Sequence, residues 1–426
     1  MGVLLESLLP DASALALPAR REAAAALLRD GLPLGREEAW KYTSLRALDQ
    51  RRYVAGDPQA ATRSVDAAAF DLPGIDGPRL VFVNGVFQAA ASDRPEVAGL
   101  DLLALSEHPG ALSGLLEDSA AGARADAFVR LNTALVADGA YVRVAAGVQV
   151  AAPLHLVFIG APADADLAWQ ARLRIELGTG AALRVVEHHL GSGAHRHLGN
   201  LVSDSRLADG ARLELLQLQD VPETSVLVRR STFRLERDAR LVATTLEAGA
   251  QLARHEFRVH LAGRGARFES RGVFVLHGRQ HADTRLDVWH EARDTACDVA
   301  WRGVADERAR GVFHGAITIQ PGADGADATL TNKNLLLSPQ AEIDSQPVLE
   351  IHADEVKAAH GATVGQLDEH ALFYLRTRGI APDAARRILV AAFCSAMLDE
   401  LAPAALRERL DGLLADRLPS AMESQP

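Results

Sequence analysis

The spacing of hydrophobic positions divides the chain into three regions. In the first, residues 20–28 are rich in alanine and leucine, and residues 37–48 repeat apolar side chains at the spacing of a helix. Residues 80–87 alternate around a central Asn-Gly dipeptide, which is typical of the two-residue turn of a β-hairpin. The pattern predicts a mainly helical region over residues 1–137, with one hairpin near residues 80–87.

From residue 138 onward, short segments of alternating polar and apolar residues replace the helical spacing, which indicates β-strands. A phrase also recurs in this region, in which a turn residue is followed by a small, a polar and a large apolar residue. Four copies begin 30, 28 and 27 residues apart, and a fifth fits between two of them: 180–183, 210–213, 238–241, 265–268 and 249–252. Such a period indicates a solenoid.

No helical pattern of ten or more residues separates these copies, so the repeating unit must be strand, turn and strand. Stacked units of this kind form a parallel β-helix, which we place at residues 138–345. A β-sandwich is the alternative, because its strands also recur about every 8 to 12 residues.

After residue 347 the helical spacing returns at residues 367–375 and 384–400, and a third helix follows Pro403. We therefore expect a C-terminal helical domain over residues 346–426. Its middle helix is apolar around much of its circumference, so it must be buried in its own domain or against a partner. The predicted fold class is α+β, mainly β.

Charge and targeting signals narrow the possible partners. The chain has 45 basic and 56 acidic residues, a net charge of 45 − 56 = −11. An acidic excess spread along the chain repels polyanions, so we expect no nucleic-acid partner. The first residues carry no basic leader, and no run approaches the roughly 18 apolar residues of a membrane span. We expect a cytoplasmic protein with no membrane partner.

Two cysteines are too few for a disulfide framework or for the four thiolates of a typical zinc or iron–sulfur site. We expect Cys394 to be buried and inert in its apolar helix, and Cys297 to be structural in a loop. None of the three lysines precedes Ser or Thr, which excludes a P-loop ATPase. His255 and His260 are five residues apart on a strand-like segment, so they do not form a zincin motif.

The remaining histidines and charges favour structural roles. His188 and His189 point to opposite faces of an extended strand, so that pair cannot chelate one ion. His195 and His197 share a face but follow a glycine-rich turn, and we expect them to be solvated. Residues 283–287 alternate charged and apolar side chains, which predicts a charged face turned to solvent.

The segment 330–380 combines two expected strands with a histidine between glycines. His360 precedes Gly361, and Gly365 lies close by. Glycines permit close backbone approach, so we expect His360 at a tight junction between the β-region and the helical domain. A structural role and a functional role for this histidine both stay open.

The same segment resembles the SufB/SufD family of iron–sulfur cluster assembly proteins, whose motif contains HGATVG followed by LFYLRSRGI. Residues 36–43, REEAWKYT, resemble an N-terminal motif typical of the SufD branch. The longer SufB branch carries a cluster-building cysteine that this chain lacks, so the SufD branch is the better match. The residues that carry the resemblance are 334–338, 341–344, 347, 349–351, 353–357, 360–365 and 372–380.

The resemblance implies a right-handed parallel β-helix between two helical domains. It also implies a non-enzymatic scaffold that pairs with SufB through the β-helices, while its C-terminal domain holds a copy of the SufC ATPase. His360 would face the SufB interface as a candidate ligand for iron or a cluster, held only transiently and not by this chain alone. Tyr374, Arg376, Arg378 and Gly379 are candidates for the SufC contact.

One departure from the family pattern and two other interpretations remain. Family members often have Cys-Ser before the histidine, whereas this chain has Ala358 and Ala359, so it offers no second thiol there. The chain could be a stand-alone homodimeric iron-binding protein. A carbohydrate-active β-helix enzyme would need clustered acidic residues along one face, and here the acidic residues alternate with arginines.

Overall fold

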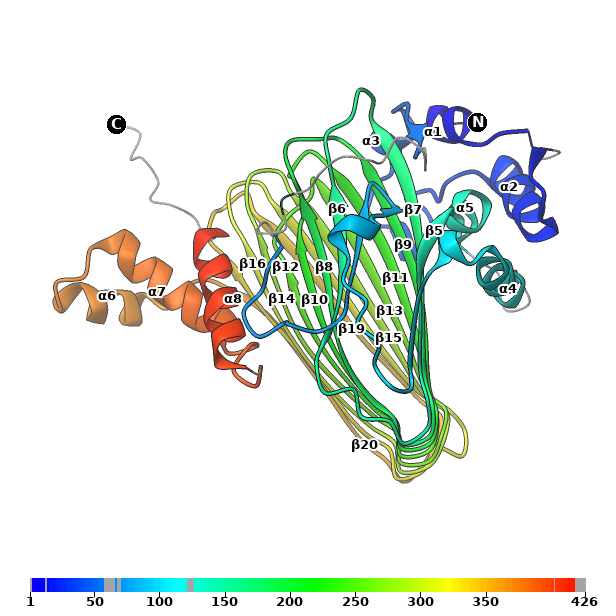
Figure 1. The fold of residues 1–426 in the computed structure, drawn as a ribbon. Coiled ribbons are helices and arrows are strands. Elements are labelled where there is room, and N and C mark those ends of the chain that lie inside the picture. Colours follow the sequence, from blue (N-terminus) through cyan, green and yellow to red (C-terminus); the bar gives the residue numbers. More distant parts are fainter. Residues whose placement is uncertain are drawn as a thin grey trace.

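The computed structural model describes residues 2–11, 14–56, 66, 70–120, 126–401 and 403–417, and a parallel β-solenoid dominates it (Figure 1). The strands form two ten-stranded sheets, here called sheet A and sheet B, and consecutive strands of the solenoid lie in opposite sheets. Each sheet receives one strand from every coil, which gives about eight turns. The predicted β-helix is confirmed, and the β-sandwich is wrong, because neighbouring solenoid strands run parallel.

Each sheet ends in shorter strands at its N-terminal side, where β4 and β3 pair antiparallel with their neighbours. Sheet A contains β1 (Val54–Ala55), β4 (Leu100–Ala104), β5 (Asp138–Val144), β7 (Leu167–Leu177), β9 (Leu198–Leu207), β11 (Val226–Leu235), β13 (Leu252–Leu261), β15 (His281–His290), β17 (Arg310–Ile319) and β19 (Glu342–Ile351). Sheet B contains β2 (Arg79–Val83), β3 (Val86–Phe87), β6 (Leu154–Gly160), β8 (Ala182–Gly191), β10 (Arg212–Asp220), β12 (Arg240–Glu247), β14 (Arg267–Leu276), β16 (Ala296–Ala305), β18 (Asp327–Leu336) and β20 (Lys357–Gly365).

The recurring sequence phrase marks one corner of successive coils. Its turn residues have left-handed backbone, with φ of 66° at Gly180, 67° at Gly210, 55° at Asp238 and 75° at Gly265. The large apolar residues that follow stack in register in sheet B: Leu183, Leu213, Leu241 and Phe268. The fifth copy, residues 249–252, leads instead into sheet A, because Leu252 begins β13. Four copies therefore lie at the same corner of successive coils, and the fifth lies at a different corner.

The N-terminal region is mixed. The predicted hairpin is confirmed: β2 and β3 pair through Phe82 and Phe87, and the turn has φ of 49° at Asn84 and 80° at Gly85. The helix expected over residues 37–48 is wrong, since two short helices and a turn replace it. The helices and 3-10 helices are α1 (Val3–Leu8), α2 (Pro18–Asp30), η2 (Glu38–Trp40), α3 (Arg46–Asp49), η5 (Ala89–Ala91), η6 (Leu105–Glu107), α4 (Pro109–Ala120) and α5 (Ala127–Leu135).

Three helices follow the last strand: α6 (Glu369–Thr377), α7 (Pro382–Ser395) and α8 (Ala404–Arg417). The ladder reaches Gly365, so β19 and β20 extend the solenoid past residue 345, where we placed its boundary with the helical domain. Apolar residues of α7 and α8, among them Cys394 and Leu410, pack on the outer face of sheet B, while α6 projects away from the solenoid (Figure 1). No helix in the described ranges is long and apolar enough to cross a membrane.

The solenoid interior holds a buried polar cluster within its apolar core. His189 Nε2 lies 2.7 Å from Glu187 Oε1, Arg229 Nη2 lies 2.5 Å from Glu247 Oε1, and His255 Nδ1 lies 3.3 Å from the same Glu247 oxygen. Burial would raise the pKa of Glu187, but the His189 hydrogen bond and the Arg229 charge lower it to about 2. A buried carboxylate therefore stays ionised because its neighbours compensate for lost hydration.

Candidate functional site

The C-terminal end of the solenoid is open. β19 pairs with β17 and β20 pairs with β18, and in the described ranges no strand pairs with the opposite edge of either. Unpaired backbone N–H and C=O groups on an edge form a template for another strand. This end is therefore a surface on which two strands of a partner can extend the two sheets, one on β19 and one on β20.

His360 lies in β20 at a position that continues the interior of the solenoid. It is in register with Leu330, a buried core residue, and behind Leu330 the same column contains Val185, Leu215, Ala243, Ser270 and Val299. Residues in register on parallel strands share a face. His360 is nevertheless exposed, because no further coil covers it. Its imidazole thus stands at the open end of a column that is otherwise mostly apolar.

The expected tight junction at His360 is wrong. A Cβ added to Gly361 or Gly365 would meet no other atom within 4 Å, so neither glycine allows a close backbone approach within this chain. The physical reason is that β20 is an edge strand whose outer side faces open space. If these glycines allow a close approach, the approaching backbone must belong to a partner bound at this edge.

Apolar and polar groups both accompany His360 at the open end. Ile351 on β19 is 43% exposed and Val364 on β20 is 45% exposed, both large fractions for residues that continue core columns. Behind them, Asn334 Nδ2 donates to Asn332 Oδ1 at 2.6 Å, and Ser345 Oγ donates to the same oxygen at 2.7 Å. The last coil thus ends in an apolar rim over a buried polar group.

Neither cysteine belongs to this end surface. Both thiols are buried, and burial raises the pKa of each to about 12. Cys394 lies in α7 as expected, whereas Cys297 lies in β16 rather than in a loop, with its sulfur 3.3 Å from His290 Nε2. Across the described ranges, no group of three or more His, Cys, Asp or Glu residues could hold a metal ion.

The four residues singled out at the C-terminal domain lie together on α6 and just after it. Tyr374 is 57% exposed, and Arg378 Nη2 donates to its hydroxyl at 3.1 Å. Gly379 ends the helix with φ of 82°. The neighbouring Phe373 is 66% exposed, which makes α6 an apolar and cationic surface on the projecting helical hairpin.

Residues 40–43, here called the N-terminal strap, cross successive strands of sheet A. The Trp40 ring lies 3.7 Å from the guanidinium of Arg254 on β13. Thr43 Oγ1 donates to Asp283 Oδ2 on β15 at 2.5 Å. The Tyr42 hydroxyl accepts from Nε2 of Gln346 on β19 at 3.1 Å. The strap therefore reaches from the middle of sheet A to its open edge.

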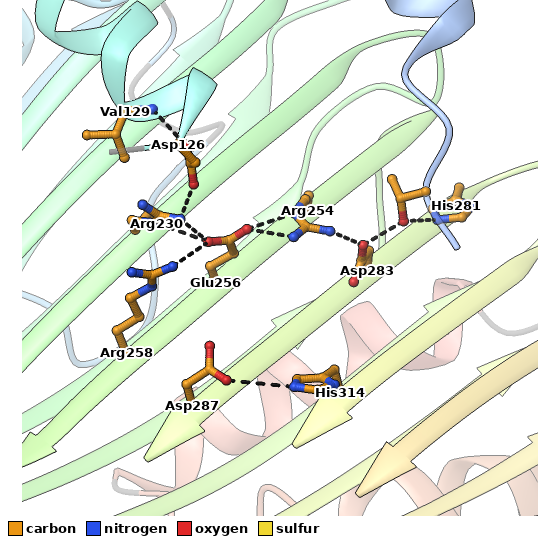
Figure 2. Close-up of polar contacts among 11 residues, drawn as sticks. Asp126, Val129, Arg230, Arg254, Glu256, Arg258, His281, Asp283, Asp287 and His314 are labelled. Carbon is orange, nitrogen blue, oxygen red and sulfur yellow. Dashed lines mark hydrogen bonds and ion pairs between the residues drawn. The ribbon is translucent and has the colours of Figure 1, made fainter. Parts of the chain in front are cut away.

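A buried charge network fastens the N-terminal region to the same face (Figure 2). Asp126 caps α5 by accepting from the Val129 N–H at 3.0 Å, and its other oxygen pairs with Arg230. Arg230 also pairs with Glu256, which pairs with Arg254 at 2.6 Å. Burial would raise the pKa of Glu256, but these two guanidinium groups hold it well below its usual range. Sequence periodicity gave no sign of this network, because alternation does not reveal which outer face is covered.

Two expectations about polar residues are wrong for related reasons. Asp283 is only 2% exposed, because it pairs with Arg254 and is covered by the strap. His195 and His197 are buried as well, because their rings stack at 4.4 Å and His197 Nε2 lies 2.8 Å from the Ala161 carbonyl oxygen. Asp283 is thus covered by the strap, and the two histidines are buried against the neighbouring coil.

Comparison with known proteins covers nearly the whole chain. Residues 158–393 match the family described as "SUF system FeS cluster assembly, SufBD core domain", and residues 6–156 match "SufBD protein N-terminal region". The iron-sulfur cluster assembly protein SufD of Escherichia coli is 30% identical over 397 residues, covering 92% of this chain and 91% of that protein. A SufBD family protein of Synechocystis, slr0076, is 29% identical over 408 residues, covering 92% and 89%. SufD of Bacillus subtilis is 26% identical over 285 residues, covering 66% and 64%.

Proposed function

Because this chain belongs to the SufBD family of SUF-system iron–sulfur cluster assembly proteins, we propose that it is a SufD-type scaffold that pairs with SufB through the open end of its solenoid. The observation that carries this proposal is the exposed double edge of β19 and β20. A partner with matching edges would satisfy the free backbone groups of both sheets at once. Such an interface would also bury Ile351 and Val364.

In the proposed complex His360 becomes an interior residue of a composite solenoid. A neutral imidazole is a good iron ligand, and this chain brings no thiol to the site. We therefore assign the thiolates of the assembly site to SufB and one histidine to this chain. Iron and the nascent cluster are cargo, held transiently between the two subunits.

The helical hairpin of α6 and α7 is the proposed docking surface for SufC. Phe373 and Tyr374 offer exposed aromatic area, and Arg376 and Arg378 add positive charge beside them. Ile388 on α7 is also 47% exposed. Aromatic residues and arginine are the types enriched in the binding core of protein interfaces. α6 projects from the solenoid while α7 packs on sheet B, so this site and the open end can be occupied together (Figure 1).

The decisive experiment separates the two surfaces by co-purification with SufB and SufC. Ile351→Glu with Val364→Glu would place charges in the proposed SufB interface and weaken that pairing by more than about a hundredfold. SufC would still bind. Tyr374→Ala with Phe373→Ala is expected to give the reciprocal result.

A matched control is Val54→Glu on β1, where Val54 is 53% exposed and lies at the opposite side of the solenoid from β19. It should leave both pairings intact. Normal SufB pairing by the double open-end variant would overturn the proposed interface. A homodimer that persists in the presence of SufB, and loads iron alone, would favour the stand-alone iron-binding protein instead.

A further inference from the structure

A cleft lies between the outer face of sheet B and the connection from α7 to α8, away from the open end. Its volume is about 390 Å³, within the range of roughly 300–1,000 Å³ typical of small-molecule sites. Strands β8, β10, β12 and β14 form one wall. Met397, Leu401 and Leu406 line the other. The cleft therefore lies between the solenoid and the C-terminal helical region that follows it in the sequence.

Arginines occupy neighbouring positions on adjacent strands of sheet B at this wall. Arg212, Arg240 and Arg267 occupy the same register position on β10, β12 and β14, so three like charges stand directly beside one another. Like charges opposite each other on adjacent strands are destabilising. Glu269 pairs with Arg240 at 2.7 Å. No carboxylate in the described part of the chain pairs with Arg212 or Arg267.

A fourth arginine extends the positive charge into the cleft. Arg184 on β8 is half-buried and donates to the Ala151 carbonyl oxygen at 2.5 Å, without a carboxylate partner among the described residues. Three glutamates also line the cleft: Glu214, Glu269 and Glu400. Glu269 is engaged by Arg240, and Arg271 at the far side pairs with Asp298 at 2.6 Å. Arg184 and Arg212 thus have no carboxylate partner among the described residues, while Glu214 and Glu400 are lining carboxylates that pair with no arginine there.

The opposite side of the cleft is apolar. Leu401 in the α7–α8 connection and Leu406 on α8 belong to one hydrophobic cluster with Leu216 and Val186 on the sheet. Met397 and Leu401 are only half-buried and line the cleft. An apolar wall beside unpaired cations suits a ligand with two chemically distinct ends. A purely ionic ligand would leave the half-buried Met397 and Leu401 uncovered, and a purely apolar ligand would leave the arginines without an anionic partner.

We propose that this cleft binds a small amphipathic anion, with a carboxylate or phosphate head on Arg184 and Arg212 and an apolar body against Met397 and Leu401. Arginine is suited to both head groups because its planar fork donates two parallel hydrogen bonds. The site is separate from the proposed SufB and SufC surfaces, so its failure would not bear on them.

The test is calorimetric titration of the full chain with decanoate, decyl phosphate and decanol as probes. Decanoate or decyl phosphate should bind saturably at one site, whereas decanol, which lacks the anion, should bind at least about tenfold more weakly. A preference between the two anions would identify the head group. Decanol binding as tightly as the anions, or no saturable binding of either anion, would overturn the proposal.

Arg212→Ala should weaken anion binding roughly tenfold, as expected for the loss of one charge-assisted hydrogen bond. Arg267→Ala is the matched control, because Arg267 holds the same register position on a neighbouring strand but does not line the cleft. Thermal unfolding of both variants confirms that each is folded. Equal effects of the two substitutions would show that surface charge, rather than the cleft, governs binding, and would overturn the proposal.

Discussion

The Tyr42 hydroxyl accepts a hydrogen bond from Gln346 across 304 positions of sequence, at 3.1 Å. This contact links the N-terminal strap to β19, the edge strand of sheet A. The Arg310 guanidinium on β17 lies 5.9 Å from the same tyrosine ring. The strap therefore supports the edge that we propose as the SufB interface.

Tyr42→Phe and Gln346→Ala test whether the strap and the edge strand are energetically coupled. Each substitution should lower the free energy of unfolding by about 1 kcal/mol, because each removes one partner of a hydrogen bond. The double variant should lose less than the sum of the two, with a coupling of about 0.5–1.5 kcal/mol measured by urea denaturation. Strict additivity would show that the two residues are independent.

Trp40→Ala should detach the strap from sheet A. Trp40 is 4% exposed, stacks on Phe128 at 5.5 Å and covers Arg254, so its removal should cost about 3–5 kcal/mol. Limited proteolysis should then cleave the N-terminal region faster. Trp40→Phe should retain part of the stacking and lose less, while Leu34→Ala, at a position that is 52% exposed, should change little. Equal cleavage of all three variants would contradict this role of Trp40.

Buried histidines predict a fall in stability under mild acid. Burial lowers the pKa of His155 to about 3 and the pKa values of His188 and His255 to about 4. Histidine in an unfolded chain titrates near pH 6.5, so between about pH 6.5 and 4 only the unfolded chain takes up these protons. The free energy of unfolding should therefore decrease with falling pH, by up to about 1.4 kcal/mol per unit for each histidine.

His155→Phe tests this pH dependence. The His155 ring stacks on His188 at 5.7 Å, and phenylalanine keeps an aromatic ring there without a titrating group. The slope of unfolding free energy against pH should become shallower between pH 6.5 and 4, as followed by urea midpoints. His352→Phe, at an exposed position, is the control. An unchanged slope for the His155 variant would assign the acid sensitivity to other groups.

Both cysteines should be unreactive in the native protein. Their thiols are buried and their pKa values are about 12, so very little thiolate exists at neutral pH. A thiol reagent such as dithionitrobenzoate should label neither residue in native buffer and both in denaturant. Rapid native labelling of Cys297 would contradict its placement inside the solenoid.

His360→Ala addresses the proposed assembly site. The complex with SufB and SufC should form normally, because the exposed imidazole supports no other part of this chain in the described structure. Iron and cluster content of the complex should fall. His352→Ala replaces another exposed histidine near the last coil and should leave the content unchanged. Equal content in both variants would reduce His360 to a surface residue.

The solenoid was predictable because residues suited to a left-handed backbone recur once in each coil. The residues at one corner need a left-handed backbone, and Gly180, Gly210 and Asp238 supply it at nearly constant intervals. The same ladder continues through Asp294 and Gly325, with φ of 58° and 78°. The sequence phrase does not identify these two copies, because the position of its large apolar residue is occupied by the smaller Cys297 and Ala328.

The covered face of sheet A and the position of His360 could not be predicted in the same way. Alternation tells which residues share a face, but Asp283 is buried by Thr43 and by Arg254, and the first of these lies 240 positions away. The family resemblance singled out His360, yet only the strand register shows that it continues a core column. Long-range contacts of this kind depend on topology, which periodicity does not record.

Because the coils stack in register, the length of the solenoid can change only in whole-coil steps. Neighbouring parallel strands are spaced by about 4.8 Å, so each added coil would carry the open end forward by one such step. The turn residues Gly180 and Gly210 are 30 positions apart. Inserting a whole repeat should lengthen the span between the N-terminal region and the proposed SufB interface while preserving every edge residue. Inserting half a repeat would place the last two strands in exchanged sheets, so the edges would no longer fit the proposed partner.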